Sequence, residues 1–298
     1  MTNARPLVSV IICVYQGARH LRQAITSALE QTYPAVEVVV VNDGSTDRSD
    51  EICRALAGHI VYVTQENAGL PRARNRGIRA SAGEYIAFLD QDDVWRPDKL
   101  EKQMRLFAEN PDLGLVYSDF SQIDHDARVV MERTHGSKMR RGFVLPDLYE
   151  ENFVGSLTAV CRRRVLEAVG LFHEDLAFAL DWDLWLRIAN DHPVDFVDES
   201  LASWRWRPNY AETQHEIMLL DSYRVISLRH AALSQKLTES QRNGVEGRLA
   251  RISFSLGRLY IGKSDMDRAV QWIRTSIEHD VFTPDQMKIL EGIEVQLA

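Results

Sequence analysis

The sequence is short of cysteine and carries no excess of positive charge. Its three cysteines, Cys13, Cys53 and Cys161, lie far apart among 298 residues and form no CxxC pair. A disulfide framework or a zinc cluster is therefore not expected, and reduced thiols in the cytoplasm are the default. The formal net charge is −8, whereas nonspecific binding of nucleic acid needs a net basic surface. No nucleic-acid partner is expected.

Long apolar runs and several common catalytic motifs are also absent. The apolar run at 7–15 is too short to span a bilayer, and no small-residue cleavage site follows it. We interpret it as a buried strand of a cytoplasmic protein, and peripheral membrane contact stays open. The patterns GxxxxGK[ST], GxGxxG, HExxH and GxSxG do not occur. Their absence argues against the NTPase, dehydrogenase, metalloprotease and hydrolase classes that carry them.

Strand and helix patterns alternate along the first part of the chain. Short runs rich in apolar and β-branched residues predict strands at 7–15, 36–41, 60–64, 84–89 and 114–120. Helical spacing or helix-start signals predict helices at 21–29, 47–57, 71–80 and 98–110. This order predicts an α/β fold with a mainly parallel sheet flanked by helices.

The rest of the chain has three further patterns. Residues 124–142 are polar and rich in Arg, Lys and His, which predicts a mobile loop, and 181–189 predicts a helix. Past residue 209 the pattern is helical, so we expect an all-α C-terminal extension over 209–298. Within it, 249–280 is similar to a single tetratricopeptide-type helical hairpin. One such unit is weak evidence, because repeats need neighbours to bury their faces.

Polar clusters follow three of the predicted strands. They are Tyr15-Gln16, Asn42-Asp43 and Asp90-Gln91-Asp92-Asp93. Ligands of doubly wound sheets bind at the carboxyl ends of the strands. We therefore expect these clusters to share one rim, although they are distant in sequence.

The acidic cluster at 90–93 indicates a cation site. Three carboxylates within four residues repel one another, and a divalent cation such as Mg²⁺ or Mn²⁺ removes that penalty while bridging to phosphate.

Each acidic motif also has a purely structural interpretation. The cluster at 90–93 fits a turn that caps a helix after Pro97, and Asp43-Gly44-Ser45 fits an Asx-type turn. In Asp181-Trp182-Asp183, the first Asp fits an N-cap and the second complements the helix dipole.

Taken in order, the motifs resemble the family 2 glycosyltransferases of the GT-A fold. The array comprises the apolar strand at 7–15, Asp43-Gly44-Ser45-Thr46-Asp47, Ala73-Arg74-Asn75-x-Gly77, the element from Gly83 to Asp93, and Asp181-Trp182-Asp183-Leu184-Trp185-Leu186-Arg187. The resemblance covers roughly residues 6–207. The Asp-x-Asp-Asp element is moderately specific by itself, whereas the ordered set is highly specific. The resemblance implies a GT-A catalytic domain over 1–208.

The resemblance also implies roles for the donor side of the site. Tyr15 matches the family tyrosine that stacks on the base of the nucleotide-sugar donor. Asp43 matches the aspartate that hydrogen-bonds the base, usually uracil. Arg74 lies in the Ala-Arg-Asn element that lines the donor pocket.

Three carboxylates match the reacting end of the family site. Asp90 matches the first carboxylate of the Asp-x-Asp motif, near the ribose and the metal, and Asp92 matches the metal ligand. Asp181 matches the general base that takes the proton from the acceptor hydroxyl. In this family the displacement is direct and inverts the anomeric centre, which is consistent with charge neutralisation by a metal and with a carboxylate base.

Four positions depart from the family pattern. Cys13 stands where Pro is typical, Gln16 where Asn is usual, and Leu180 where an acidic residue often precedes the catalytic aspartate. The segment Trp204-Arg205-Trp206-Arg207 resembles the family Tyr-Arg-x-His element, with Arg207 in place of His. We hypothesise that Arg207 neutralises the donor diphosphate, since guanidinium suits phosphate. The alternative is an ordinary surface arginine.

The identity of substrates and partners stays open at this stage. The sequence favours an inverting transferase that uses Mn²⁺ or Mg²⁺ and a nucleotide-diphosphate sugar, with a glycan, lipid-linked or protein acceptor. The alternatives are a nucleotidyltransferase of similar fold and a non-catalytic module that acts through the C-terminal helices. A homodimer is possible through these helices. Basic clusters at 138–141 and 162–164 fit either a lipid-phosphate contact or a solvated surface.

Overall fold

The structure is a computed structural model that describes residues 5–207, 210–279 and 292. Its contacts divide the chain into two compact units. The first comprises Met1–Val144 and Asn152–Pro208, and the second comprises Leu145–Glu151 and Asn209–Ala298. The domain boundary expected from the sequence, between residues 208 and 209, lies outside the described residues.

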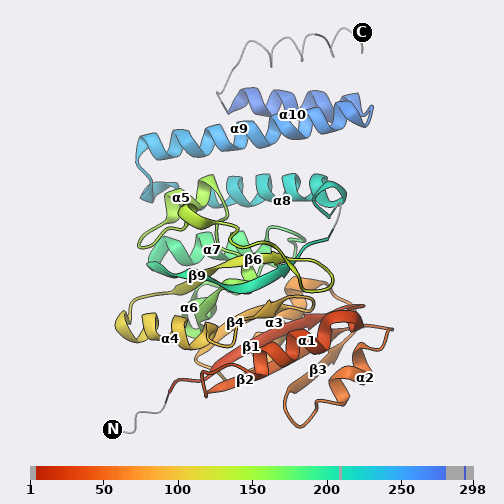
Figure 1. Cartoon of the computed structure of the whole chain (residues 1–298). Coiled ribbons are helices and arrows are strands. Elements are labelled where there is room, and N and C mark those ends of the chain that lie inside the picture. Colours follow the sequence, from red (N-terminus) through yellow and green to blue (C-terminus); the bar gives the residue numbers. More distant parts are fainter. Residues whose placement is uncertain (1–4, 208–209, 280–291, 293–298) are drawn as a thin grey trace. The chain divides into compact units, whose positions relative to one another are not determined.

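A nine-stranded sheet forms the centre of the first unit (Figure 1). Its strands are β1 (Val8–Val14), β2 (Val36–Asp43), β3 (Val61–Gln65), β4 (Tyr85–Asp90), β5 (Val94–Trp95), β6 (Leu115–Ile123), β7 (Val129–Met131), β8 (Val160–Arg162) and β9 (Val194–Arg205). The strand order is β3-β2-β1-β4-β8-β6-β9-β5, with β7 paired to β6. Neighbours are parallel from β3 to β4 and between β6 and β9, and antiparallel elsewhere. The predicted α/β fold is confirmed.

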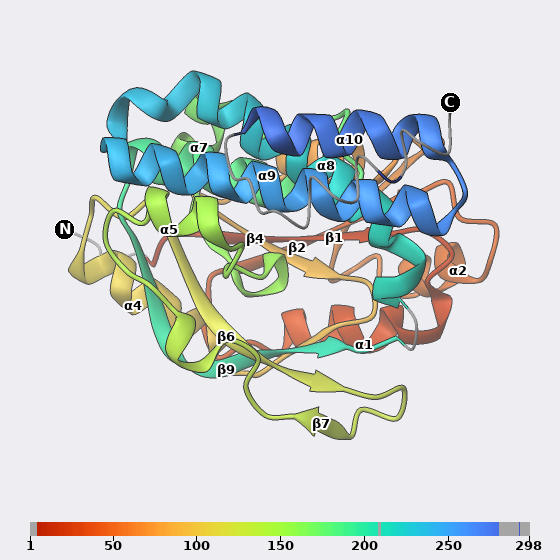
Figure 2. The same cartoon turned by 90° about the horizontal axis from the view of Figure 1, so that it is seen from above.

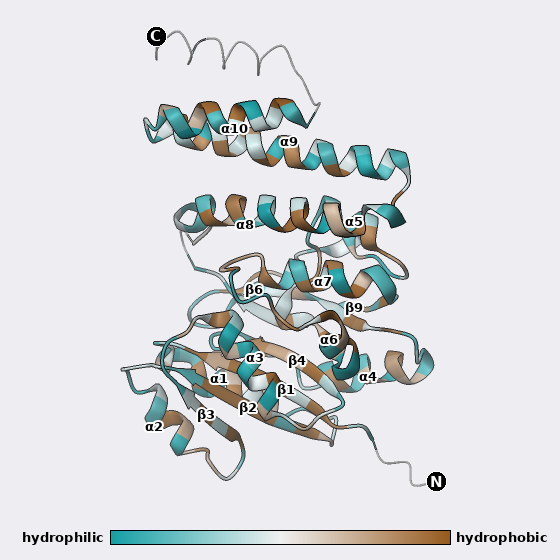
Figure 3. Cartoon of the chain, turned by 180° about the vertical axis from the view of Figure 1, so that it is seen from behind, coloured by the Kyte–Doolittle hydropathy of each residue, from teal (hydrophilic) through white to brown (hydrophobic). Residues whose placement is uncertain are grey.

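Helices cover both faces of the parallel part of this sheet. The helices of the first unit are α1 (Ala18–Leu29), α2 (Ser49–Arg54), α3 (Leu70–Ala80), α4 (Lys99–Glu109), α6 (Arg163–Val169) and α7 (Leu180–Asp191). In α1 the buried residues recur at helical spacing, Leu21, Ala24, Ile25 and Ala28. They pack in one core cluster with alternate residues of β1, such as Val10. The strands β1, β2 and β4 are correspondingly apolar along their length (Figure 3).

Gly77 brings α3 close to the opposite face of the same sheet. A Cβ atom at this position would lie 2.5 Å from Cγ2 of Ile11 and 3.1 Å from Cγ2 of Val41. No side chain fits at such distances, so glycine sets the spacing between α3 and the sheet. The close approach is relevant to the site, because α3 also carries Arg74.

The strand β9 was not predicted from the sequence, although it is the longest strand of the sheet. It lies alongside β6, with β7 on the far side of β6 (Figure 2). Its pairing with β6 shifts register between Ser118 and Phe120, where Val197 and Ser200 oppose consecutive β6 residues. Asp198 and Glu199 therefore bulge out of the ladder.

The segment 124–142, predicted to be a mobile loop, is mostly irregular backbone but has more local structure than expected. The segment contains β7 and a short 3₁₀ helix at Gly136–Lys138. Its backbone is organised by the buried Asp119, whose carboxylate accepts N–H bonds from Thr134 (3.2 Å), His135 (2.9 Å) and Gly136 (2.8 Å). Arg133 adds a contact from Nε at 3.0 Å. One buried carboxylate thus replaces the backbone pairing that a sheet would provide.

The second unit is helical, as predicted. Its helices are α5 (Leu145–Glu150), α8 (Tyr210–Leu233), α9 (Glu239–Gly262) and α10 (Met266–Glu278). A capping box formed by Thr238 and Gln241 starts α9, and Asp265 caps α10. The α9–α10 pair forms a helical hairpin with mixed apolar and polar surfaces (Figure 3). Its likeness to a tetratricopeptide unit stays a prediction, and the predicted end at Asp280 lies outside the described residues.

Among the helices that the structure describes, none combines the length and the apolar content needed to cross a bilayer.

Candidate active site at the strand ends

The structure brings the three polar clusters of the strand ends together. Between β1 and β4, the backbone N–H of Tyr15 donates to Oε1 of Gln91 (2.9 Å), and Nε2 of Gln91 donates to the Tyr15 carbonyl (3.3 Å). Between β1 and β2, the N–H of Gln16 donates to Oγ of Ser45 (3.1 Å), and its Nε2 donates to Oγ1 of Thr46 (2.8 Å). These bonds hold the three strand ends at one rim. The ring of Tyr15 remains half exposed there (49%).

Asp43 closes the loop that leads into α3. Its Oδ1 accepts hydrogen bonds from Nε2 of Gln65 (2.7 Å) and from the N–H of Ala68 (2.9 Å), and its Oδ2 accepts one from the N–H of Gly69 (2.9 Å). Gly44 permits the sharp turn after Asp43, because its φ is +78°. Asp43 is only 4% exposed, so its carboxylate organises the wall of the site and has little open surface.

Arg74 is the buried cation of the site. It projects from α3, is 4% exposed, and donates from Nη2 to Oδ1 of Asp90 at 2.8 Å. Its guanidinium carbon lies 5.6 Å from the ring centroid of Phe88 and 5.3 Å from that of Phe172. Burial opposes the charge, but Asp90, Cys13 and Asp181 outweigh it and hold the pKa of Arg74 above its usual value. The guanidinium is therefore fixed between two rings and permanently charged.

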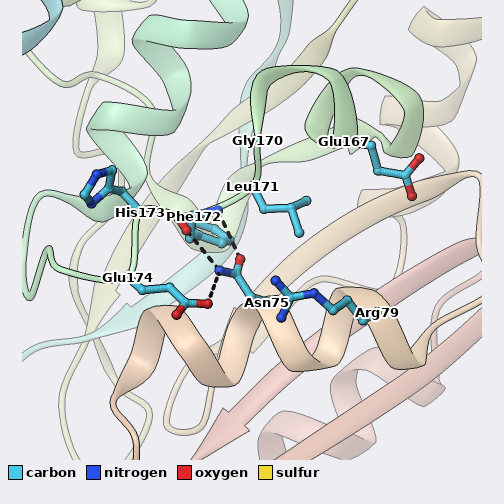
Figure 4. A pocket seen from close by; sticks show the side chains of 8 residues that line it. All are labelled: Asn75, Arg79, Glu167, Gly170, Leu171, Phe172, His173 and Glu174. Carbon is cyan, nitrogen blue, oxygen red and sulfur yellow. Dashed lines mark hydrogen bonds between the residues drawn. The ribbon is translucent and has the colours of Figure 1, made fainter.

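Asn75 fixes the segment that carries Phe172. Its Nδ2 donates to the Phe172 carbonyl (2.9 Å) and to Oε1 of Glu174 (3.2 Å), and its Oδ1 accepts from the Phe172 N–H (3.0 Å). Figure 4 shows these bonds at the edge of a cavity of about 530 Å³ between α3 and 167–174. This positioning role of Asn75 was not predicted from the sequence, although the residue lies within the Ala-Arg-Asn element.

We expect Asn75→Leu to lower the free energy of unfolding by about 1–3 kcal/mol, because it leaves the N–H and C=O of Phe172 buried without partners. Urea titration of the purified protein measures this loss. Asn67→Ala, at an exposed loop position, is the control and should change stability by less than about 0.5 kcal/mol. Equal effects of the two substitutions would contradict the positioning role of Asn75.

Asp181 lies in the first turn of α7. Its Oδ1 accepts from the N–H of Trp182 (2.7 Å) and from Nδ2 of Asn152 (3.4 Å). Burial raises the pKa of Asp181 to about 6, against the lowering effect of Arg74. A carboxylate with a pKa in this range is suited to accept a proton near neutral pH.

Asp183 has a structural partner two residues further along α7. Its Oδ2 accepts from Nε (3.0 Å) and Nη2 (2.7 Å) of Arg187. The same guanidinium donates to the carbonyl of Leu171 at 2.6 Å. Asp183 and Arg187 thus join the start of α7 to the segment at Leu171, next to Phe172, to which Asn75 bonds.

Arg205 and Arg207 contact the turn that contains Asp92. Arg207 donates from Nε to Oδ2 of Asp92 at 3.0 Å, and its Nη2 contacts the same oxygen. Arg205 is 1% exposed and donates from Nε to the carbonyl of Asp92 (2.8 Å) and from Nη1 to that of Asp124 (2.6 Å). A role was predicted from the sequence for Arg207 but not for Arg205, which fixes the backbone of Asp92.

Asp93 is a buried acid beside these carboxylates. Its Oδ1 accepts from the backbone N–H of Arg205 at 2.8 Å, while its buried Oδ2 has no partner among the described residues. Burial, with the negative charges of Asp90 and Asp92, raises its pKa well above the usual value.

Within residues 5–207, 210–279 and 292, no three His, Cys, Asp or Glu side chains come together as a set of metal ligands. Asp90 and Asp92 nevertheless fit a cation that completes its coordination elsewhere. Mg²⁺ in nucleotide sites is commonly held by one or two carboxylates together with substrate phosphates and water. Asp90 and Asp92 are the carboxylates that could serve in this way here.

The basic cluster at 162–164 is only partly a surface feature. Arg162 donates from Nε to the Leu113 carbonyl (2.8 Å), and Arg163 donates from Nη1 to the Ile78 carbonyl (3.0 Å) and from Nη2 to that of Ser81 (3.0 Å). Both guanidinium groups serve the interior of the first unit. Neither interpretation from the sequence, a lipid-phosphate contact or a solvated cluster, describes them.

An acidic cluster at the carboxyl ends of a mixed α/β sheet is found in enzymes that act on nucleotides at these strand ends. Comparison with known proteins identifies the family. Residues 9–170 match the family model described as glycosyl transferase family 2. The chain belongs to this family.

Relatives of similar sequence are named glycosyltransferases. An uncharacterised glycosyltransferase of Rickettsia typhi is 36% identical over 205 residues, which is 67% of this chain and 64% of that protein. A second, from Rickettsia prowazekii, has the same identity and coverage. The chain thus spans about 64% of the length of these relatives. The Bacillus subtilis protein TuaG, named a putative teichuronic acid biosynthesis glycosyltransferase, is 32% identical over 69% of this chain and 81% of its own.

Solved structures of similar fold include a UDP complex and a mannosyltransferase complex. Staphylococcus aureus TarS (residues 1–349) in complex with UDP aligns with a TM-score of 0.69 and 19% identity, over 95% of this chain and 83% of that chain. The mannosyltransferase PcManGT of Pyrobaculum calidifontis, in complex with GDP-Man and Mn²⁺, aligns with a TM-score of 0.62 and 17% identity, over 99% and 82%. At these identities the likeness concerns the fold alone.

Proposed function

We propose that this chain transfers a sugar from a UDP-sugar to an acceptor hydroxyl and inverts the anomeric centre. The observation that carries the proposal is the arrangement around Arg74. This buried guanidinium contacts Asp90 on the donor side, and its charge lowers the pKa of Asp181 on the acceptor side. A base and a donor-binding carboxylate that both interact with one fixed cation suit a single displacement at the sugar carbon.

The donor nucleotide would bind along the strand ends. The half-exposed ring of Tyr15 offers a surface for stacking on a base. The carboxylate of Asp43 accepts three hydrogen bonds from the protein and can accept a further one from a donor such as a uracil N–H at its small exposed edge. UDP is favoured because TarS, a protein of similar fold, binds it.

Asp90 and Asp92 would hold a Mn²⁺ or Mg²⁺ ion together with the donor diphosphate. Such an ion neutralises the negative charge that develops on the departing nucleoside diphosphate. Arg205 keeps the Asp92 backbone in place through its bond to the carbonyl. In the reaction itself, Asp181 accepts the acceptor hydroxyl proton as the oxygen bonds to the sugar carbon. The bond from that carbon to the diphosphate breaks at the same time.

The acceptor is proposed to be a growing polysaccharide. Support comes from the relative TuaG, whose name places it in teichuronic acid biosynthesis. A lipid-linked oligosaccharide or a protein would present the same nucleophile, a hydroxyl group. We further propose that 1–208 is the catalytic domain and that the helical extension at 209–298 contacts the acceptor or a second copy of the chain.

Thermal unfolding with nucleotides tests the donor site. We expect UDP with Mn²⁺ to raise the melting temperature by several degrees, since a ligand at 100 times its Kd adds about 2.7 kcal/mol. The rise should be lost with EDTA and in Asp92→Asn. GDP, CMP and dTDP serve as matched controls. A rise with another nucleotide would reassign the base, and no rise with any of them would favour a binding module that acts through the helical unit.

A further inference from the structure

Each of the two carboxylates proposed for the metal already has a guanidinium partner. Asp90 pairs with Arg74 at 2.8 Å, and Asp92 pairs with Arg207 through two nitrogens on one oxygen. The two arginines differ in exposure and in their surroundings. The side chain of Arg74 is 5% exposed and lies between two rings, whereas that of Arg207 is 47% exposed. Only the second pair is placed to open.

We propose that Arg207 is a tethered cation that holds Asp92 in the metal-free protein, and that a divalent ion reaches Asp92 only by displacing it. The inference rests on the proposed function, because it takes Asp92 as the metal ligand. It extends that function by giving Arg207 a role before the donor binds. Arg207 and the ion then exclude each other at a single carboxylate oxygen.

The competition follows from charge and from the shape of the site. Nε and Nη2 of Arg207 both bond to Oδ2 of Asp92, so a metal bound at this oxygen would meet a positive charge at contact distance. Arg205 fixes the backbone of Asp92 through the bond to its carbonyl at 2.8 Å from a buried position, so only rotation of the side chain could take the carboxylate away from Arg207. The side chain of Asp92 is also only 14% exposed. Arg207 is the partner that must leave.

A bound nucleotide changes this balance. The displaced guanidinium of Arg207 finds a new anionic partner in a diphosphate, for which its planar fork is well suited. The ion and the nucleotide should therefore bind cooperatively, and the ion should bind weakly when it is alone. A family member with histidine at this position would bring no permanent charge to the carboxylate.

Titration of the free protein with Mn²⁺ tests the competition without any turnover. Electron paramagnetic resonance of unbound Mn²⁺ gives the Kd in the absence of nucleotide. We expect Arg207→Ala to lower this Kd roughly tenfold, because a positive charge beside the ligand is removed. Arg207→Lys keeps the charge but loses the two-nitrogen contact and should give an intermediate value. Arg54→Ala, which removes an exposed arginine paired with Asp50, is the matched control and should leave the Kd unchanged.

A double-substitution cycle with Asp92→Asn tests whether the effect acts through this carboxylate. In the Asp92→Asn background, Arg207→Ala should no longer tighten Mn²⁺ binding. An unchanged or weaker Mn²⁺ affinity in Arg207→Ala alone, or no measurable binding in any variant, would overturn the inference. The proposed function is judged separately, by the UDP-dependent rise in melting temperature of the unsubstituted protein. UDP binding with an unaltered Mn²⁺ Kd in Arg207→Ala would leave that function standing and remove only the role of Arg207.

Discussion

Replacing Asp181 with asparagine is expected to reduce kcat for sugar transfer by about 10³-fold, because the amide cannot take the proton of the acceptor hydroxyl. The substitution preserves the shape of the side chain. It also keeps the Oδ1 atom, which accepts the hydrogen bond from the Trp182 N–H. Donor binding should therefore persist, and the melting-temperature rise with UDP and Mn²⁺ should match that of the unsubstituted protein. This combination separates a catalytic base from a residue that merely shapes the site.

Release of UDP from a UDP-sugar, coupled to a chromogenic assay, measures the loss. Asp112→Asn, at an exposed turn after α4, is the control and should retain full activity. If Asp181→Asn kept more than a tenth of the activity, the base would have to be another residue.

The pH dependence of the reaction gives a second view of the same carboxyl. A base with a pKa of about 6 acts only when it is deprotonated, so activity should fall as the pH drops below about 6. The Arg74 charge lowers this pKa against the dominant effect of burial. In Arg74→Met the acid limb of the kcat profile should move to higher pH. If the activity of the unsubstituted protein fell only near pH 4, burial would not be raising the pKa of the catalytic carboxyl.

The central strands and their polar ends could be predicted because local sequence decides both. A nearly continuous apolar run cannot be placed outside a core, and the predicted strand at 7–15 is observed as Val8–Val14. Parallel strands then bring their carboxyl ends together whatever the loops between them. The meeting of Tyr15, Asp43 and Asp90 at one rim needed no further information.

The strand β9 could not be predicted because its pattern is interrupted where it matters. The bulge at Asp198 and Glu199 places two acidic residues in the middle of the strand and breaks the alternation of apolar and polar positions. Pairing with β6 overrides that local signal. The organisation of 124–142 escaped prediction for a related reason, since it depends on Asp119, a polar residue inside a strand.

The supporting residues of the site escaped prediction because their partners are distant in sequence. Asn75 bonds to Phe172, 97 residues away, and Arg205 bonds to Asp92, 113 residues away. A single sequence gives the residue types but not these pairings. The motif residues were visible because several carboxylates gather within a few positions, whereas an isolated Asn or Arg looks like any surface residue until the fold places it in the interior.

Lys99 is expected to make the stability of the first unit depend steeply on pH. It is fully buried, and Nζ donates to Oε1 of Gln103 at 2.7 Å and lies 4.0 Å from the ring centroid of Trp95. Burial lowers the pKa of Lys99 well below the usual 10.5. Between the two pKa values the unfolded chain binds one more proton than the native protein. The contribution of Lys99 to the free energy of unfolding is therefore complete above pH 10.5. It declines as the pH falls, by about 1.4 kcal/mol per pH unit, until the pKa of Lys99 in the native protein is reached.

Lys99→Met removes this titration, so the variant should not lose this part of its stability as the pH is lowered from 9.5 to 7. The difference in free energy of unfolding, variant minus unsubstituted protein, should therefore rise over this range. Urea titrations at several pH values measure the difference. The slope is the readout, because the loss of the Gln103 contact adds a cost that does not vary with pH. Lys102→Met on the same helix is the matched control. The pKa of Lys102 is raised by its contacts with Glu199 and Asp98, so it stays protonated in both states below pH 9.5, and its effect on stability should be flat. A flat difference for Lys99→Met as well would mean that the buried amine keeps its proton, held by the Trp95 ring and Gln103 against the cost of burial.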